Sequence, residues 1–312
     1  MQESPVMHQV AKRPALTNRL HLRLENPVKL LNIGCGRCYH NAWTNIDLVA
    51  ATPEVRAYDL RRGLPYQDDQ FDGVYHSHVL EHLTPDAAAS MLRECARVLK
   101  PGGVLRVAVP DLEGIAREYL RTLQAASDQS TPTNIARHRW MTLELIDQMT
   151  RQRTGGLMGQ TIREPGETPQ EFIRGRLGYE VEGNAKVKNH KTLGMRLSRL
   201  LASTRKQLAL TAVTIIDGST GRDAYREGRF RQSGELHRWM YDRVSLSRLL
   251  TDIGMDHPQV CHADESRIDR FDSYGLDRDG QRVRKPDSLF MEAIKVSQAA
   301  TRSTSSPSAN AA

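Results

Sequence analysis

Leu31-Asn32-Ile33-Gly34-Cys35-Gly36 is an apolar run that leads into two closely spaced glycines. The run from Val28 to Ile33 has the composition of a buried strand. A strand that leads into G-x-G makes a tight turn, where the backbone can approach a ligand closely. In an open parallel sheet such a turn lies at the carboxyl ends of the strands, which is where ligands bind. The stretch therefore predicts an α/β protein with a ligand site at this turn.

Further short apolar runs predict the other strands of this sheet. They lie at 45–49, 55–58, 71–75, 104–109, 259–262 and 288–295. Helical or loop connections between parallel strands cover a sheet on both faces. The predicted fold class is therefore a Rossmann-like α/β fold, with a doubly wound, mostly parallel sheet of seven strands.

The clearest helix is expected between the fourth and fifth strands. Thr84 stands at the cap position and Pro85 at the first helical position. Lys100-Pro101-Gly102-Gly103 is expected to end the helix. Its apolar stripe follows the 3.6-residue period at Ala88, Met91, Leu92, Cys95, Val98 and Leu99. A later helix is expected at 245–253, ended by Gly254.

The chain divides into five parts by composition. They are a flexible lead-in at 1–26, the first half of the sheet at 27–111, a helical basic insertion or lid at 112–240, the C-terminal part of the sheet at 241–296 and a disordered tail at 297–312. Between Arg151 and Trp239 there are 17 Lys or Arg residues against 9 Asp or Glu residues, and the whole chain carries a net charge of +7. The insertion thus holds the excess positive charge, which either meets an anionic partner or is a solvated helical surface.

Two aspartates after the second and third strands indicate which ligand the turn holds. A dinucleotide site needs a third glycine where Tyr39 stands, and a phosphate-binding loop needs a G-K-S/T sequence that does not follow. A ligand with a ribose, an adenine and an amino acid, but no phosphate, fits better. Asp47 can accept two hydrogen bonds from ribose hydroxyls, and Asp59 can accept one from the adenine amine. Either residue can instead be an ordinary turn or cap aspartate.

Five motifs in order give the chain a family resemblance. They are L-N-I-G-C-G at 31–36, N-I-D-L at 45–48, Y-D-L-R-R-G-L-P-Y at 58–66, F-D-G-V-Y-H-S-H-V-L-E-H-L at 71–83 and R-V-L-K-P-G-G at 97–103. From Lys29 to Asp111 the chain resembles the type 11 methyltransferase domain of class I S-adenosylmethionine-dependent methyltransferases. H-R-W-M-Y-D-R-V-S-L at 237–246 and R-K-P-D-S-L-F-M-E-A at 284–293 are similar to predicted methyltransferases that accompany polysaccharide biosynthesis.

The resemblance implies S-adenosyl-L-methionine as the cofactor, with 27–111 as the cofactor-binding half of the domain. It places Ser77 and His78 near the sulfonium. The family usually has an acidic residue where Asn32 stands and a third glycine where Cys38 stands; Asn32 can still orient an amine through water or a backbone carbonyl. The full set of expected cofactor-binding residues is Asn32, Gly34, Cys35, Gly36, Asp47, Asp59, Leu60, Ser77 and His78.

Methyl transfer is an in-line displacement at a sulfonium carbon, so the protein's main task is to hold the acceptor and the methyl group in line. A hydroxyl acceptor also needs a base to take its proton. His237, His78 and Asp111 are the candidate catalytic bases by position. The predicted enzyme is an S-adenosylmethionine-dependent methyltransferase that O-methylates a small acceptor such as a sugar or glycan.

No metal is expected, although two patterns raise the question. His78, Glu81 and His82 stand at i, i+3 and i+4, which places them on one face of a helix, but three ligands at one turn are hard to converge. Cys35 and Cys38 form a C-x-x-C pair without the second pair that a structural zinc site needs.

Two other functions stay open. A degenerate methyltransferase fold could be a binding module in a synthetic complex, and the departures at Asn32 and Cys38 agree with that. The basic insertion suggests an RNA methyltransferase, but His76-Ser77-His78-Val79 replaces the proline–aromatic signature of RNA-directed amino methylation, which disfavours nucleic acid. Nothing approaches the roughly 20 apolar residues of a membrane helix, and a signal peptide is not evident. A cytoplasmic protein without a transmembrane segment is expected. Peripheral contact with an anionic surface stays open.

Overall fold

The computed structural model describes residues 28–164, 166–178 and 193–296. The expected lead-in at 1–26 and the expected tail at 297–312 lie outside the described residues. Within the described part, no helix is both long enough and apolar enough to cross a membrane.

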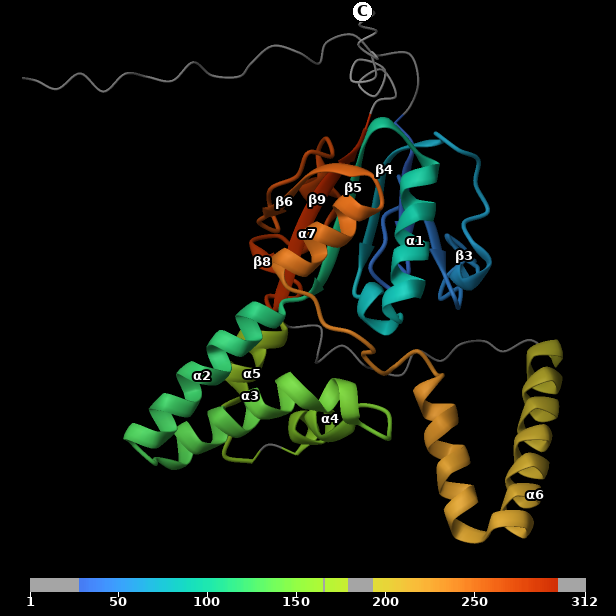
Figure 1. Ribbon diagram of the computed structural model, residues 1–312, viewed down its shortest axis with the longest axis vertical. Coiled ribbons are helices and arrows are strands. Elements are labelled where there is room, and N and C mark those ends of the chain that lie inside the picture. The colour runs from blue at the N-terminus through green and yellow to red at the C-terminus, as the bar shows by residue number, and fades with distance from the viewer. Residues whose placement is uncertain (1–27, 165, 179–192, 297–312) are drawn as a thin grey trace, which may run out of the picture.

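A seven-stranded sheet forms the centre of the molecule (Figure 1). Its order is β3-β2-β1-β4-β5-β9-β6, and only β9 runs antiparallel to its neighbours. The strands are β1 (Leu30–Ile33), β2 (Thr44–Asp47), β3 (Val55–Ala57), β4 (Phe71–Ser77), β5 (Leu99–Pro110), β6 (Met255–Cys261) and β9 (Ser288–Lys295). The predicted mostly parallel sheet of seven strands is confirmed. The fifth strand starts earlier than predicted, because Leu99 already pairs with Phe71 and an irregularity lets Lys100–Gly103 pass within the strand.

Helices α1 (Pro85–Val98) and α7 (Arg243–Asp252) pack against one face of this sheet. The predicted apolar stripe of α1 is buried there with Leu246 and Leu250 of α7. Thr84 occupies the cap position of α1, although its side chain accepts no capping hydrogen bond. Asp242 caps α7 through a capping box with Ser245. Both helices therefore begin where local sequence signals place them.

Loops cover the opposite face of the sheet. The chain between β6 and β9 runs through the short helix η4 (Phe271–Tyr274) and the hairpin β7 (Arg278–Asp279) and β8 (Arg282–Val283). Ile268, Phe271 and Leu276 from this excursion pack on apolar side chains of the sheet. Arg106 of β5 is fully buried beneath it and forms ion pairs with Asp277 and Glu292, both at 2.8 Å. A buried guanidinium thus anchors the loop where a helix is missing.

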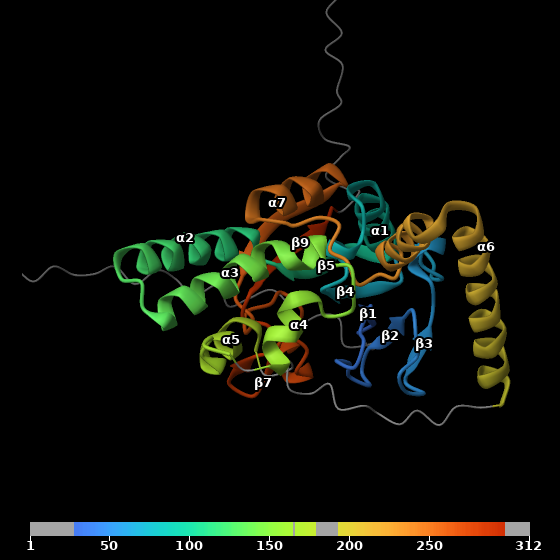
Figure 2. The same cartoon turned by 90° about the horizontal axis from the view of Figure 1, so that it is seen from below.

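The basic insertion is helical, as expected. Its helices are α2 (Leu112–Asp128), α3 (Pro132–Thr150), α4 (Gly156–Arg163), α5 (Gln170–Leu177) and α6 (Leu193–Arg231). Helices α2 to α5 share a small apolar core around Trp140 and lie beyond the carboxyl end of β5 (Figures 1 and 2). Helix α6 stands away from the sheet and is interrupted at Gly218. The insertion therefore faces the edge where a parallel sheet binds ligands.

Candidate functional site

The turn after β1 has the backbone that its glycines predict. Gly34 and Gly36 adopt φ angles of 64° and 55°, the left-handed region that glycine occupies without cost. The backbone N–H groups of Gly34 and Cys35 both donate to the carbonyl of Ile46, at 2.8 and 3.3 Å. A Cβ atom on Gly34 would lie 2.4 Å from Cγ2 of Val79. Close packing against Val79 therefore requires glycine at position 34.

Asp47 lies beside this turn and holds it. Its Oδ2 accepts a hydrogen bond from the N–H of Gly36 at 2.9 Å, and its Oδ1 accepts one from the N–H of Val49 at 3.1 Å. The carboxylate is therefore fixed at the carboxyl end of β2, as the sequence predicts.

A cavity of about 530 Å³ opens beside the turn, on the loop-covered side of the sheet. We call it the glycine-turn cavity. Its lining residues include Asn32, Gly34, Cys35, Gly36, Ser77, His78, Tyr274, Asp277, Lys285 and Phe290. Six of the nine predicted cofactor residues thus share one cavity. Asp47, Asp59 and Leu60 lie outside its lining.

Asn32 supplies the unpaired polar atom of this cavity. Its Nδ2 donates to the carbonyl of Cys38 at 3.2 Å and to Oδ1 of Asn45 at 3.3 Å. Its Oδ1 is buried and accepts no hydrogen bond from the described residues. A buried acceptor without a donor is costly, and a ligand amine in the cavity would satisfy it. The expectation that Asn32 orients an amine stays a prediction.

Asp59 does not present a free carboxylate. It caps the short helix η1 (Leu60–Arg62) by accepting from the N–H of Arg61. The Arg61 guanidinium also donates to both of its oxygens, at 2.7 to 3.1 Å. These hydrogen bonds lower the pKa of Asp59 to about 2. Leu60 is half-buried against the helix-side core. The predicted contact of Asp59 with an adenine amine would have to compete with Arg61.

A second cavity, of about 480 Å³, lies between the sheet edge and the insertion. We call it the insertion cavity. It is lined by His78, Pro110, Gln148, Arg151, Thr154, Gly155, Met158, Gly159, Ile162, Arg163, Leu177, Lys285 and Asp287. His78 and Lys285 line both cavities. These two side chains therefore border both spaces.

His78 is held in a fixed orientation at this junction. It follows β4 with a φ angle of 54°, a conformation that few non-glycine residues adopt outside functional sites. Its Nε2 lies 2.8 Å from Oγ of Ser288, and its Nδ1 lies 3.2 Å from Oε1 of Glu81. A carboxylate beside Nδ1 favours the proton on that nitrogen and leaves the lone pair on Nε2. His78 thus has the geometry of an oriented base.

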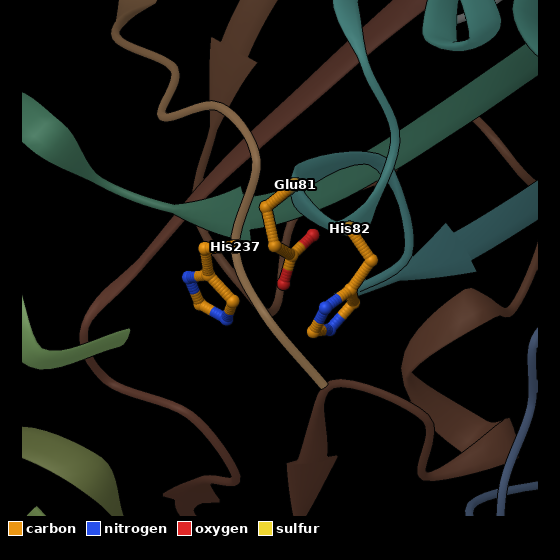
Figure 3. A group of neighbouring side chains, drawn as sticks. All are labelled: Glu81, His82 and His237. Atoms are coloured by element: carbon orange, nitrogen blue, oxygen red, sulfur yellow. The ribbon is translucent and has the colours of Figure 1, made fainter. Parts of the chain in front are cut away.

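The other two predicted bases are placed differently. Asp111 caps α2, accepting from the N–H of Glu113 at 3.1 Å, and lines neither cavity. His237 is 5% exposed, also lines neither cavity, and has a pKa lowered to about 3, chiefly by burial. Figure 3 shows His237 beside Glu81 and His82 instead. Neither residue is positioned to take a proton from an acceptor in the insertion cavity.

Several lining residues escaped the sequence reasoning. Lys285, just before β9, lies far along the chain from the glycine turn and was noted only within the motif at 284–293. Arg151 and Arg163 were visible only as part of the basic segment. Cys35 and Cys38 form no disulfide, and burial raises the pKa of Cys35 to about 12. This is opposite to what a metal-binding thiolate needs.

Comparison with known proteins gives this site a class. Residues 35–107, a minor part of the chain, match the family model described as a methyltransferase domain. The matched segment runs from the glycine turn through His78 to β5, so this part of the chain is similar to a methyltransferase domain, and S-adenosylmethionine is the cofactor that this similarity indicates. No curated protein matches the chain.

Solved structures show more distant similarity. The [4+2]-cyclase SpnF is 25% identical over 27% of this chain and 40% of its own, with a TM-score of 0.22. A Burkholderia thailandensis 1,6-didemethyltoxoflavin N1-methyltransferase with bound S-adenosylhomocysteine is 23% identical over 28% of this chain and 47% of its own, with a TM-score of 0.24. A Methanosarcina mazei SAM-dependent methyltransferase is 13% identical over 87% of this chain and 94% of its own, with a TM-score of 0.35. These TM-scores are low, so the class rests on the family match.

Proposed function

We propose that this protein O-methylates a small, negatively charged hydroxyl compound, such as an acidic sugar or a glycan carrying one. The observation that carries the proposal is that His78 lines both cavities. The cofactor would occupy the glycine-turn cavity and the acceptor the insertion cavity. His78 would then stand between the methyl donor and the hydroxyl that receives the methyl group.

The glycine-turn cavity offers groups suited to the amino acid end of the cofactor. Asn32 Oδ1 would accept from the amine, and the open backbone at Gly34 and Gly36 allows close approach of the chain. We assign the ribose to Asp47, whose carboxylate is fixed beside Gly36. S-adenosylmethionine, when bound, supplies a methyl group on a positively charged sulfur.

His78 would act as the general base. Glu81 lies next to Nδ1, so Nε2 is the nitrogen free to take the acceptor's proton. The hydroxyl of Ser288 occupies that nitrogen at 2.8 Å, and an acceptor hydroxyl would replace it. General base catalysis contributes about 10²- to 10⁴-fold, and alignment of the reacting atoms contributes about 7–11 kcal/mol to lowering the barrier. Positioning is therefore the larger task.

The lining of the insertion cavity indicates the charge of the acceptor. Arg151, Arg163 and Lys285 line it, against the single carboxylate of Asp287. Burial raises the pKa of Asp287, and His78, Arg176 and Lys285 partly offset that effect. A carboxylate or sulfate on the acceptor would pair with these cations. This supports an acidic sugar over a neutral one.

The test has two stages. Calorimetry with S-adenosylhomocysteine should show binding, and no detectable affinity would favour the alternative of a methyltransferase-fold binding module. Methyl transfer should then be measured, as S-adenosylhomocysteine released, with glucuronate and glucose as probes. We expect the acidic probe to be the better acceptor. Equal or faster turnover of the neutral probe would refute the charge assignment.

The His78→Gln variant separates catalysis from binding. It should lower kcat by about 10²- to 10⁴-fold and leave S-adenosylhomocysteine affinity within about threefold. His257→Gln is a matched control, because the His257 side chain is 73% exposed and lies outside both cavities. If His78→Gln retained wild-type turnover, another group would have to be the base.

A further inference from the structure

Three side chains from distant parts of the sequence meet on the helix-covered side of the sheet. Glu81 and His82 belong to the short helix η2 (Leu80–His82) after β4, and His237 lies in the segment that leads into α7. One potential ligand atom from each lies within 4.8 Å of the others (Figure 3). None of the three lines either cavity. The group nevertheless adjoins the proposed base, because Oε1 of Glu81 lies 3.2 Å from Nδ1 of His78.

Glu81 is the member of the group whose burial costs the most free energy. It is fully buried; its Oε1 lies 3.2 Å from Nδ1 of His78, whereas its Oε2 has no hydrogen-bond partner among the described residues. Burial acts to raise its pKa, but the neighbouring His78 outweighs that effect and lowers the pKa below its usual value. The carboxylate is therefore ionised. A buried ionised carboxylate is strongly unfavourable unless hydrogen bonds or a cation compensate it, and Oε2 has no such partner among the described residues.

The two histidines are in the state that metal binding requires. Burial lowers the pKa of His82 and of His237, so both rings are neutral. The Nδ1 of His82 lies 3.3 Å from the carbonyl of Leu236 and donates to it, which leaves Nε2 as a lone-pair donor. The Nδ1 of His237 is buried without a partner among the described residues. The rings stand at 83° to one another, with centroids 4.8 Å apart.

The backbone already holds the two segments together. The carbonyl of Glu81 accepts hydrogen bonds from the N–H groups of Arg238 and Trp239, at 2.7 and 3.3 Å. The N–H of His237 donates to the carbonyl of Gln148 at 2.9 Å. Rigid backbone on both sides keeps the three side chains facing one another. The arrangement is thus a preformed set of donors.

We propose that Glu81, His82 and His237 bind a divalent transition-metal ion of the zinc type. Two neutral imidazoles and one carboxylate are a ligand set that Zn²⁺ and Fe²⁺ accept, whereas Ca²⁺ and Mg²⁺ prefer oxygen ligands alone. Metal–ligand bonds of about 2.0–2.2 Å require the donors to draw closer than their present separation. The ion would tie η2 to the segment before α7, with the fourth position open to water.

The experiment uses the full chain after chelator treatment. Co²⁺ and Zn²⁺ are titrated calorimetrically, the metal content is measured by mass spectrometry, and the Co²⁺ form is examined by visible absorption. We expect one metal ion per chain, cobalt d–d bands of nitrogen and oxygen ligands, and a raised Tm. His237→Gln should weaken Co²⁺ binding at least tenfold and abolish the Tm shift, while the exposed control His257→Gln should do neither.

Other results would overturn the proposal. These are no stoichiometric binding to the wild-type chain, equal affinity in His237→Gln and His257→Gln, or a cobalt–thiolate charge-transfer band. That band would assign the ion to Cys35 or Cys38 instead. If His237→Gln does not fold, Glu81→Gln provides the same comparison, because it removes the charge and keeps the shape of the side chain. Unchanged metal affinity in Glu81→Gln would contradict the proposal equally.

Discussion

Arg106→Met tests how much the buried ion pairs of Arg106 stabilise the loop that covers one face of the sheet. Arg106 has no exposed side-chain surface, and its partners Asp277 and Glu292 have side chains that are 2% and 3% exposed. Its guanidinium also donates to the carbonyls of Glu265 and His262, at 2.7 and 3.1 Å. Methionine fills similar space without charge. The variant therefore leaves two buried carboxylates without their cation.

The expected loss of stability follows from the burial of these two carboxylates. Removing one partner of a buried ion pair costs about 3–5 kcal/mol, because the other charge stays buried and uncompensated. Both carboxylates keep other hydrogen bonds: Asp277 accepts from Tyr75, and Glu292 accepts from Ser266 and from the N–H of Arg267. These contacts and protonation of a carboxyl group limit the loss. We expect the variant to lose about 3–5 kcal/mol at pH 7 rather than twice that amount.

The loss should depend on pH with a definite sign. Burial raises the pKa of Asp277, and Arg106 opposes that effect. Without Arg106 the folded-state pKa rises further above the unfolded one, so the folded variant binds protons more readily. Its stability therefore falls as pH rises above the unfolded carboxyl pKa. The deficit relative to wild type should be smaller at pH 5 than at pH 7.

Urea unfolding of both proteins at pH 5 and pH 7 measures these quantities. Arg61→Met is the control, because its guanidinium is exposed and also pairs with an aspartate; its midpoint should match wild type. A deficit below about 1 kcal/mol for Arg106→Met at pH 7, or one that grows as pH falls, would refute the reasoning.

Three further results are expected. Asp47→Ala should lower S-adenosylhomocysteine affinity at least tenfold in calorimetry, because it removes the ribose acceptor and releases the N–H of Gly36; wild-type affinity would remove that assignment. Gly34→Ala should weaken the same affinity and lower Tm, because its Cβ would overlap Val79 at a positive φ; an unchanged Tm would contradict the close packing. Burial lowers the pKa of His76 to about 4, so stability is fully present above the unfolded pKa of about 6.5 and is lost as pH falls toward 4. The free energy of unfolding should fall by about 2 kcal/mol between pH 7 and pH 5. His76→Asn should make the free energy of unfolding less dependent on pH in urea titrations.

The local chain signals were sufficient for the sheet and its helix-covered face. Every predicted strand overlaps an observed one, because apolar runs between polar turns report burial over a few residues. The stripe of α1 is buried because its period matches the helix. Gly34, Gly36 and Asp47 could be placed together because parallel strands end at the same edge.

These local signals do not predict contacts between segments that lie far apart in the sequence. No periodicity shows that Lys285 and Ser288 would meet His78, that His237 would join Glu81 and His82, or that a loop anchored by Arg106 would replace helices. Such pairings depend on where the chain returns after an insertion and on which charges are desolvated there. Apolar burial is recorded locally in the order of residues, whereas the partner of a buried charge is fixed only when the distant strand or loop has packed against it.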